Sequence, residues 1–238
     1  MSCVLINGGS RGIGASMVEL FSKEGYSVAF TYKNSDSCAK ALAERTGALA
    51  VKADSSSEAE VVAAVSFVRE RLGAIDVLIN NAAISSFSLL SDISYEEWNS
   101  IFATNVGGAF LYSKAVLPYM INKKHGRIIN ISSMWGITGS SCEVHYSSTK
   151  AALIGFTKAL AKEVGPSGIT VNAIAPGLID TDMNKSLSDE DKKSLVDETP
   201  LMRIGKPADV AEAALFLASD KASFITGEVL SVNGGFLI

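Results

Sequence analysis

Short apolar runs rich in β-branched residues alternate with amphipathic stretches from one end of the chain to the other. Seven of these runs have the length and composition of strands. They are Cys3–Asn7, Ser27–Thr31, Leu49–Ala53, Ile75–Asn80, Arg127–Ser132, Ile169–Ile174 and Glu228–Val232. The stretches between them place apolar residues at helical spacing, as Ile13, Met17, Leu20 and Phe21 do. Nearly continuous apolar strands joined by helical crossovers are typical of a parallel sheet covered on both faces, so we expect an α/β fold with a doubly wound, seven-stranded sheet.

The composition fits one globular domain over residues 1–238. Hydrophobic residues make up 47% of the chain, which is enough for a core, and no Pro/Ser-rich linker or repeat divides it. The net charge is −4 and basic residues are not clustered, so a nucleic-acid partner is not expected. No apolar stretch reaches the 18 residues of a membrane helix, which argues against a membrane partner.

The cysteines and the first residues indicate the cellular compartment, and the histidines indicate whether a metal is bound. Three widely spaced cysteines, Cys3, Cys38 and Cys142, argue against a disulfide framework and fit a reducing cytoplasm. The N-terminal residues lead directly into the first predicted strand without the basic leader of a signal peptide. The two histidines, His125 and His145, lack metal-ligand spacing, so no metal is expected.

A glycine-rich turn follows the first predicted strand and leads directly into a helix. It runs Gly8-Gly9-Ser10-Arg11-Gly12-Ile13-Gly14, with the spacing Gly-x-x-x-Gly-x-Gly. Glycines permit a tight turn and let backbone N–H groups at the positive end of the helix approach a pyrophosphate. A tight turn that binds nothing is the alternative interpretation.

The end of the second predicted strand bears on the choice of cofactor. NAD enzymes place an acidic residue there, on the ribose 2′-hydroxyl. Here the chain reads Thr31-Tyr32-Lys33-Asn34, with no acid before Asp36. Lys33 and Arg11 are placed to meet a 2′-phosphate, which favours NADP(H) and leaves NAD(H) as the second choice. An ordinary surface charge is the alternative interpretation of Lys33.

Tyr146 and Lys150 begin an apolar helix and lie four residues apart, so their side chains share one helical face. An ammonium about 4 Å from a phenol favours the phenolate by roughly 4 kcal/mol at an effective dielectric of 20, or about 3 pKa units. We therefore expect Lys150 to lower the pKa of Tyr146 into a range useful for proton transfer. Ser133 ends the fifth predicted strand, where a hydroxyl can bond a substrate oxygen.

Further motifs follow the other strands in a recognisable order. They are Asn80-Asn81-Ala82-Ala83, Thr104-Asn105-Val106-Gly107, Pro176-Gly177 and Asn233-Gly234-Gly235. Together with the glycine-rich turn and Tyr-x-x-x-Lys, they resemble the short-chain dehydrogenase/reductase family over essentially the whole chain. Within that family the chain is most similar to the 3-oxoacyl-[acyl-carrier-protein] reductases. The resemblance implies a Rossmann-type fold and a nicotinamide cofactor.

The resemblance also implies roles for individual residues. By family analogy Tyr146 protonates the developing alkoxide, Lys150 lowers its pKa and binds the nicotinamide ribose, and Ser133 orients the carbonyl. Asn105 is implied to hold a water that links Lys150 to solvent. The implied cofactor-binding residues are Gly8, Ser10, Arg11, Gly12, Ile13, Gly14, Lys33, Asp54, Ser55, Asn81, Ala82, Ala83, Tyr146, Lys150, Pro176, Gly177, Ile179 and Thr181.

This sequence departs from the family pattern at two of these turns. Asn7 stands where the family has a Thr that braces the turn after the fourth strand, and an Asn can still form hydrogen bonds there. Ala83 replaces the usual Gly and adds a methyl group where backbone and cofactor come close.

The implied activity is NADPH-dependent reduction of a ketone to a secondary alcohol. The expected substrate is a 3-oxoacyl thioester of the fatty acid biosynthesis type, either a small molecule or bound to an acyl carrier protein. A short-chain dehydrogenase of a sterol, sugar or small alcohol is the main alternative. A catalytically silent nucleotide-binding regulator is disfavoured, because Ser133, Tyr146 and Lys150 are all present.

Three surface features complete the expectations. Lys123, Lys124 and Arg127 fit the basic site entrance expected of enzymes that meet an acidic carrier protein. The family implies a homotetramer that pairs the helices within 105–123 and 146–164. The polar stretch 185–198 is either a mobile lid or an ordinary surface helix.

Overall fold

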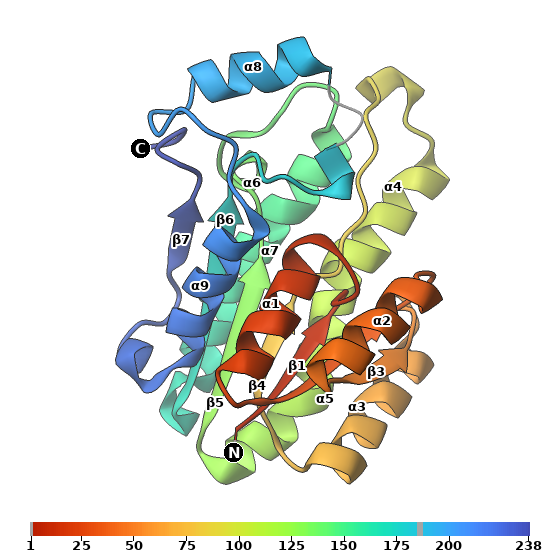
Figure 1. Ribbon diagram of the computed structural model, residues 1–238, viewed down its shortest axis with the longest axis vertical. Helices are drawn as coiled ribbons and strands as arrows, with labels where there is room; N and C mark the ends of the chain where they lie inside the picture. Colours follow the sequence, from red (N-terminus) through yellow and green to blue (C-terminus); the bar gives the residue numbers. More distant parts are fainter. Residues whose placement is uncertain (1, 185–187) are drawn as a thin grey trace.

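The apolar runs form one parallel sheet with the strand order β3-β2-β1-β4-β5-β6-β7 (Figure 1). The computed structural model describes residues 2–184 and 188–238. The strands are β1 (Cys3–Asn7), β2 (Ser27–Tyr32), β3 (Leu49–Lys52), β4 (Ile75–Asn80), β5 (Gly126–Ile131), β6 (Ile169–Pro176) and β7 (Val229–Val232). The predicted doubly wound, seven-stranded sheet is confirmed. The bounds of β1 and β4 are as predicted, β5 lies one residue earlier at both ends, and the other four strands differ by one or two residues at one end, where strands fray.

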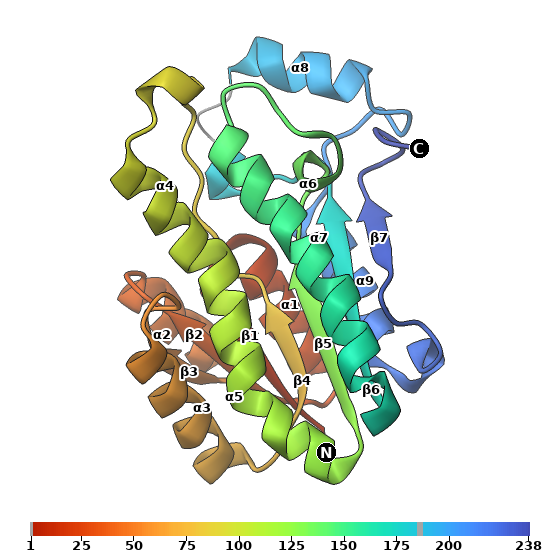
Figure 2. The same ribbon diagram turned by 180° about the vertical axis from the view of Figure 1, so that it is seen from behind.

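Helices cover both faces of the sheet, as Figures 1 and 2 show from opposite sides. One layer contains α1 (Gly12–Lys23), α2 (Asp36–Thr46) and α9 (Pro207–Ala218), and the other contains α3 (Glu58–Leu72), α5 (Gly108–Lys123) and α7 (Val144–Val164). The side chains of alternate residues in each strand point toward one helix layer and then toward the other. Val4 and Ile6 pack toward α1, whereas Cys3 and Leu5 pack toward α5. This is why the inner strands are apolar at nearly every position.

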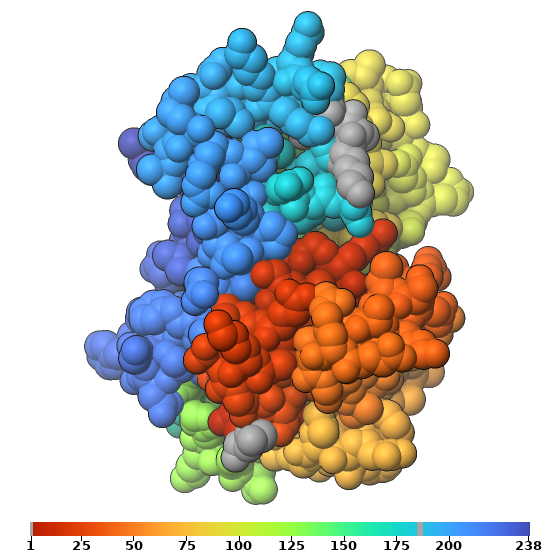
Figure 3. Space-filling model, viewed as in Figure 1, coloured from red at the N-terminus to blue at the C-terminus, as the bar shows by residue number. Residues whose placement is uncertain are grey.

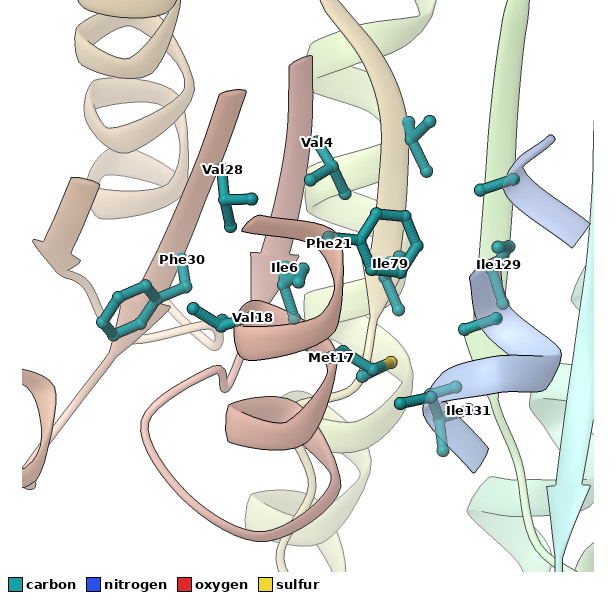
Figure 4. Packing of buried hydrophobic residues seen from close by; sticks show 14 of the residues in the cluster. Val4, Ile6, Met17, Val18, Phe21, Val28, Phe30, Ile79, Ile129 and Ile131 are labelled. Carbon is teal, nitrogen blue, oxygen red and sulfur yellow. The ribbon is translucent and has the colours of Figure 1, made fainter. Parts of the chain in front are cut away.

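The core beneath α1 is tightly filled. Met17, Val18 and Phe21 point from α1 onto the valines, isoleucines and phenylalanine of β1, β2 and β4 (Figure 4). Each side chain is fully buried, and burial of one such side chain contributes roughly 1.5–3 kcal/mol. The packing fixes the helix so that its N-terminus, with the glycine-rich turn, lies at the carboxyl edge of the sheet.

Successive strands are added on one side of β1 up to β3 and on its other side from β4 onward, so the loops after β1 and β4 diverge at the carboxyl edge. Three shorter helices, α4 (Tyr95–Phe102), α6 (Trp135–Thr138) and α8 (Asp189–Asp197), stand above this edge (Figure 1). The surface is indented between the part that carries α4 and the part that carries α2 (Figure 3). Ligands of open α/β sheets bind at such an edge.

The polar stretch 185–198 is described only in part, because residues 185–187 lie outside the described residues. The remainder forms α8, which begins with a capping box made by Ser188 and Asp191 and buries none of its side chains. Among the described residues, no helix is long and apolar enough to span a membrane.

Candidate active site

Tyr146, Lys150 and Ser133 meet at the carboxyl edge, and all three are buried. The Nζ of Lys150 lies 5.5 Å from the centroid of the Tyr146 ring and donates a hydrogen bond to the carbonyl oxygen of Ile131 at 2.8 Å. Ser133 follows β5, and its side chain hydrogen-bonds with the phenol of Tyr146. The four-residue spacing on α7 and the strand-end position of Ser133 therefore bring together the groups that the sequence associates.

Burial shifts the pKa of both titrating groups. It raises the pKa of Tyr146 above the ordinary phenol range; the Glu143 carboxylate raises it further, and the hydrogen bond with Ser133 lowers it in part. Burial also lowers the pKa of Lys150 to about 7. The pKa of Tyr146 is therefore shifted upward, whereas the four-residue spacing predicted a downward shift. The reason is that burial disfavours both the phenolate of Tyr146 and the charged form of Lys150 that was expected to stabilise it.

Asn105 lies in a π-helical segment, Ala103–Gly107, between α4 and α5. Its side-chain oxygen accepts from the backbone N–H of Ile84 at 2.8 Å, and its Nδ2 donates to the carbonyl of Ile84 and to Thr149 Oγ1, both at 3.0 Å. Both amide hydrogens thus have partners within the protein. A water linked to Lys150 through this residue must use the remaining oxygen lone pair or the backbone carbonyl.

The glycine-rich turn forms a cradle of closely packed backbone, and side chains at its glycine positions would fill that cradle. Gly8 and Gly12 have φ values of +66° and +56°, which favour glycine. A Cβ on Gly8 would lie 2.7 Å from the Cα of Ala82, and one on Gly14 would lie 2.2 Å from the carbonyl oxygen of Gly8. The turn therefore packs backbone against backbone.

The N-terminus of α1 has no side-chain cap, which it shares with α5, α6 and α7 but not with α3, α4 and α8. Serine side chains cap α3, α4 and α8, but Arg11 at the start of α1 makes no side-chain cap, and the first turn of α1 has no acidic residue. Backbone N–H groups at this end, together with the positive end of the helix dipole, suit a phosphate group. Ser10 and Ile13 flank this end of the helix.

Asn7 joins the glycine-rich turn to the turn after β4. Its Oδ1 accepts from the backbone N–H groups of Asn81 at 2.7 Å and Ala82 at 2.6 Å. The Nδ2 of Asn81 donates to the carbonyl of Gly8 at 2.8 Å. The expectation that Asn7 still braces this turn is confirmed, and Ala83 continues the chain directly from it.

Four of the expected cofactor-binding residues, Arg11, Lys33, Asp54 and Ser55, lie in the turns after β1, β2 and β3. Lys33 and Asp54, which the resemblance assigns separately, form an ion pair at 2.6 Å. Burial tends to raise the pKa of Asp54, but Lys33 and Ser56 hold it below its usual value. Ser55 is buried and interacts with the hydroxyl of Tyr112 on α5. Arg11 is exposed at the start of α1.

The loop after β6 lies over the glycine-rich turn. A methyl group at Gly12 would lie 3.3 Å from Cγ2 of Thr181. Ile179 is buried and forms a β-bridge with Gly205. The carbonyl of Pro176 accepts from the N–H of Met134, which ties this loop to the residues just after Ser133. Gly177 packs against the backbone of Asn233.

Two residues at the site, Thr149 and Ser132, were not predicted from the sequence. Thr149 links Asn105 to α7 and donates to the carbonyl of Tyr146 at 2.7 Å. Ser132 donates to the carbonyl of Lys150 at 2.8 Å. Helical spacing offered a signal for Thr149, because it is three residues after Tyr146 and faces the same side. Ser132 carried no such signal.

The basic cluster at the end of α5 lies at the amino edge of the sheet, away from Tyr146. Lys123 pairs with Asp76, and Arg127 pairs with Asp220 at 3.2 Å. β5 runs from this cluster toward Ser133 and spans about 20 Å at the usual rise per residue. The prediction that Lys123, Lys124 and Arg127 line the site entrance is wrong for a single chain.

Comparison with known proteins agrees with this geometry. A family model described as Enoyl-(Acyl carrier protein) reductase matches residues 8–237. The chain is 46% identical over 236 residues to the 3-oxoacyl-[acyl-carrier-protein] reductase FabG of Chlamydia trachomatis serovar D, and 42% identical over 233 residues to that of Escherichia coli (strain K12). Each match covers 97% of this chain and 95% of the relative. A solved structure of a mutant short-chain dehydrogenase/reductase from Serratia marcescens has a TM-score of 0.93 and 34% identity, covering 99% of this chain and 97% of that one. The chain belongs to the short-chain dehydrogenase/reductase family of nicotinamide-dependent oxidoreductases.

Proposed function

We propose that the chain reduces a 3-oxoacyl thioester to the 3-hydroxyacyl thioester with NADPH, as one catalytic domain over residues 1–238. The observation that carries the proposal is the buried group of Tyr146, Lys150 and Ser133 beside the glycine-rich turn. The relatives named 3-oxoacyl-[acyl-carrier-protein] reductase support the thioester as substrate, free or on an acyl carrier protein. We assign the reaction to the cytoplasm, where the free cysteines stay reduced.

A nicotinamide dinucleotide suits the residues at the carboxyl edge. When bound, it supplies the hydride that reaches the carbonyl carbon. The glycine cradle and the uncapped start of α1 support a pyrophosphate there. We assign Gly8, Ser10, Gly12, Ile13 and Gly14 to the pyrophosphate, Asp54 and Ser55 to the adenine, Asn81, Ala82 and Ala83 to the ribose, and Pro176, Gly177, Ile179 and Thr181 to the carboxamide end.

The protein's own groups handle the proton. Burial and Glu143 keep Tyr146 protonated at neutral pH, which is the form that reduction of a ketone requires. Its O–H gives the proton to the carbonyl oxygen of the ketone, while the hydroxyl of Ser133 donates a hydrogen bond to the same oxygen. Lys150, whose pKa burial lowers to about 7, stabilises in its charged form the phenolate that remains and hands it a proton from solvent.

The preference for NADPH rests on Arg11 and Lys33. Arg11 is exposed beside the glycine-rich turn, and Lys33 follows β2 with 59% of its side chain exposed. The ion pair between Lys33 and Asp54 is partly solvated, and such pairs contribute only about 0–1 kcal/mol. A dianionic 2′-phosphate can therefore compete with Asp54 for Lys33.

The test compares initial rates of NADPH and NADH oxidation with an acetoacetyl thioester as the ketone. We expect NADPH-selective turnover, and we expect Arg11→Ala combined with Lys33→Ala to raise the KM for NADPH while the rate with NADH stays the same. Tyr146→Phe should lower kcat by about 10²–10⁴ and leave the Kd for NADPH unchanged.

Two outcomes redirect the assignment. Tight NADPH binding without turnover of any 3-oxoacyl thioester would refute the proposed substrate and favour a sterol, sugar or small-alcohol dehydrogenase. Retention of full activity by Tyr146→Phe would remove the proposed role of the phenol. A catalytically silent regulator would bind NADPH equally well with either residue at position 146 and turn over nothing.

A further inference from the structure

The segment of residues 84–88, which follows β4, is attached to the elements around Tyr146. Asn105 binds both the backbone N–H and the carbonyl of Ile84. The hydroxyl of Ser85 donates to Glu143 Oε1 at 3.0 Å, one residue before α7. Figure 2 shows the chain between β4 and α4 running beside the start of α7. We call residues 84–88 the site wall.

A buried histidine supplies a further attachment. His145 directly precedes Tyr146 and is fully buried in the first turn of α7. Its Nε2 lies 2.6 Å from Ser86 Oγ on the site wall, and that hydroxyl donates to Glu97 Oε1 on α4 at 2.5 Å. Three elements, the site wall, α4 and α7, are thus joined through one hydroxyl group.

The hydrogen-bond pattern assigns the tautomer of His145. A serine hydroxyl has a single hydrogen, and here it goes to the Glu97 carboxylate, which can only accept. The Nε2 of His145 must therefore carry the hydrogen and donate to Ser86 Oγ. Nδ1 is buried without a hydrogen-bond partner among the described residues.

We propose that His145 is a positioning residue for the ketone: its Nε2–H, through Ser86 and Glu97, holds the site wall in place beside Tyr146. His145 itself touches neither substrate nor cofactor. The site wall carries Phe87, whose side chain is 73% exposed, and ends where the N–H of Ser88 bonds the carbonyl of Cys142. A looser wall weakens the fit of the ketone and leaves the glycine-rich turn, and with it the cofactor, unaffected.

Two amide variants separate the hydrogen bond from simple packing. The side-chain nitrogen of glutamine can reach the place of the histidine Nε2, whereas that of asparagine ends near the place of Nδ1. We expect His145→Asn to raise the KM for an acetoacetyl thioester about tenfold, the size of one buried hydrogen bond, with kcat and the Kd for NADPH changed less than about twofold. His145→Gln should stay within about twofold of the unmodified enzyme. His125→Asn, at the other histidine, is the matched control.

A double-mutant comparison tests the route through Ser86. Ser86→Ala alone should raise the KM at least as much as His145→Asn does, because it also loses the bond to Glu97, and the double variant should be no worse than Ser86→Ala. Additive effects, an unchanged KM in His145→Asn, or equal impairment of the Gln and Asn variants would each overturn the proposal. Ser86→Ala also decides the case if His145→Asn does not fold.

The kinetic part rests on the proposed function, so a second readout is independent of turnover. Amide hydrogen exchange of a peptide that covers the site wall should be about tenfold faster in His145→Asn than in the unmodified protein or in His145→Gln. If the unmodified protein reduces no thioester, the proposed function fails and the exchange rates still decide this inference. Equal exchange in all three proteins would refute the positioning role.

Discussion

Burial disfavours the charged form of Lys150, which is the form that proton transfer uses. Its pKa in the folded chain is about 7, against an ordinary value of 10.5, and burial is the cause. Between these two pH values the unfolded chain binds more protons than the folded one, so raising the pH favours folding. Below pH 7 both states are protonated, and the full cost of the buried charge is present.

This sign predicts a specific difference between the protein and Lys150→Met. Above pH 7, the free energy of unfolding of the unmodified protein should rise relative to that of the variant by up to about 1.4 kcal/mol per pH unit. Below pH 7, the difference between the two free energies should not change with pH. Urea unfolding of both proteins at pH 6, 7, 8 and 9 measures the difference, and other titrating groups cancel because they are shared. Parallel curves across this range would contradict a buried, readily deprotonated Lys150.

Single residues at the site were predictable from sequence where chemistry and local spacing coincide. The four-residue separation of Tyr146 and Lys150 fixes their common face, and the strand end fixes Ser133. The bonds of Asn105 to Thr149 and of Ser86 to His145 join residues that are 44 and 59 positions apart. They depend on how α4 packs against α7, which no local pattern contains.

At the scale of elements, the turns after β1 and β4 act as one unit because Asn7 supports both. Asn7→Ala would leave two backbone N–H groups without their acceptor, along with the Oδ1 of Asn80, which accepts from Asn7 Nδ2 at 2.9 Å. We expect a loss of about 2–4 kcal/mol in the free energy of unfolding and a weaker Kd for NADPH. Chemical denaturation and fluorescence titration measure the two effects.

Asn7→Thr is the control for this element, since its hydroxyl keeps an acceptor next to the turn. It should recover most of the stability and of the NADPH affinity. A loss as large as that of the alanine variant would mean that the volume of the Asn side chain, and not its hydrogen bonds, supports the two turns.

The elements themselves were largely predictable, because a buried parallel strand needs an apolar side chain on both faces. Their ends were less so. β6 continues two residues beyond the predicted end, to Pro176, which is paired with Val232 of β7; the ladder bond to the Val232 carbonyl comes from the N–H of the next residue, Gly177, at 3.0 Å, so it does not need an N–H on the proline. The position of Lys123 and Arg127 was misjudged although chain order indicates it: both come at or before the start of β5, whereas Ser133 follows its end, so the length of the strand separates them.

At the scale of the whole molecule, one rule connects the sheet to the site. All seven strands are parallel, so the loops that carry candidate site residues, which follow β1 to β6, open at the same edge. Order and direction of the strands therefore bring together residues as distant as Gly12 and Thr181. The same rule does not explain why apolar side chains are left exposed on the helices of a single chain.

Phe110, Tyr119 and Ile121 on α5 are each exposed by more than 40%. α5 and α7 lie on the same outer face (Figure 2), and a large exposed apolar surface is typical of an interface between subunits. We expect a homotetramer in solution, with the mass of four 25.0 kDa chains. Phe110→Glu should give a smaller species, because pairing this face would bury an unpaired carboxylate.

Sedimentation velocity of the unmodified protein and of the variant distinguishes the outcomes. Val62→Glu is the matched control, since Val62 is 51% exposed on α3 and receives the same charge outside the expected contact. It should sediment as the unmodified protein does. A monomeric unmodified protein would refute the tetramer, whereas a tetramer that survives Phe110→Glu would place its interfaces on helices or strands other than α5.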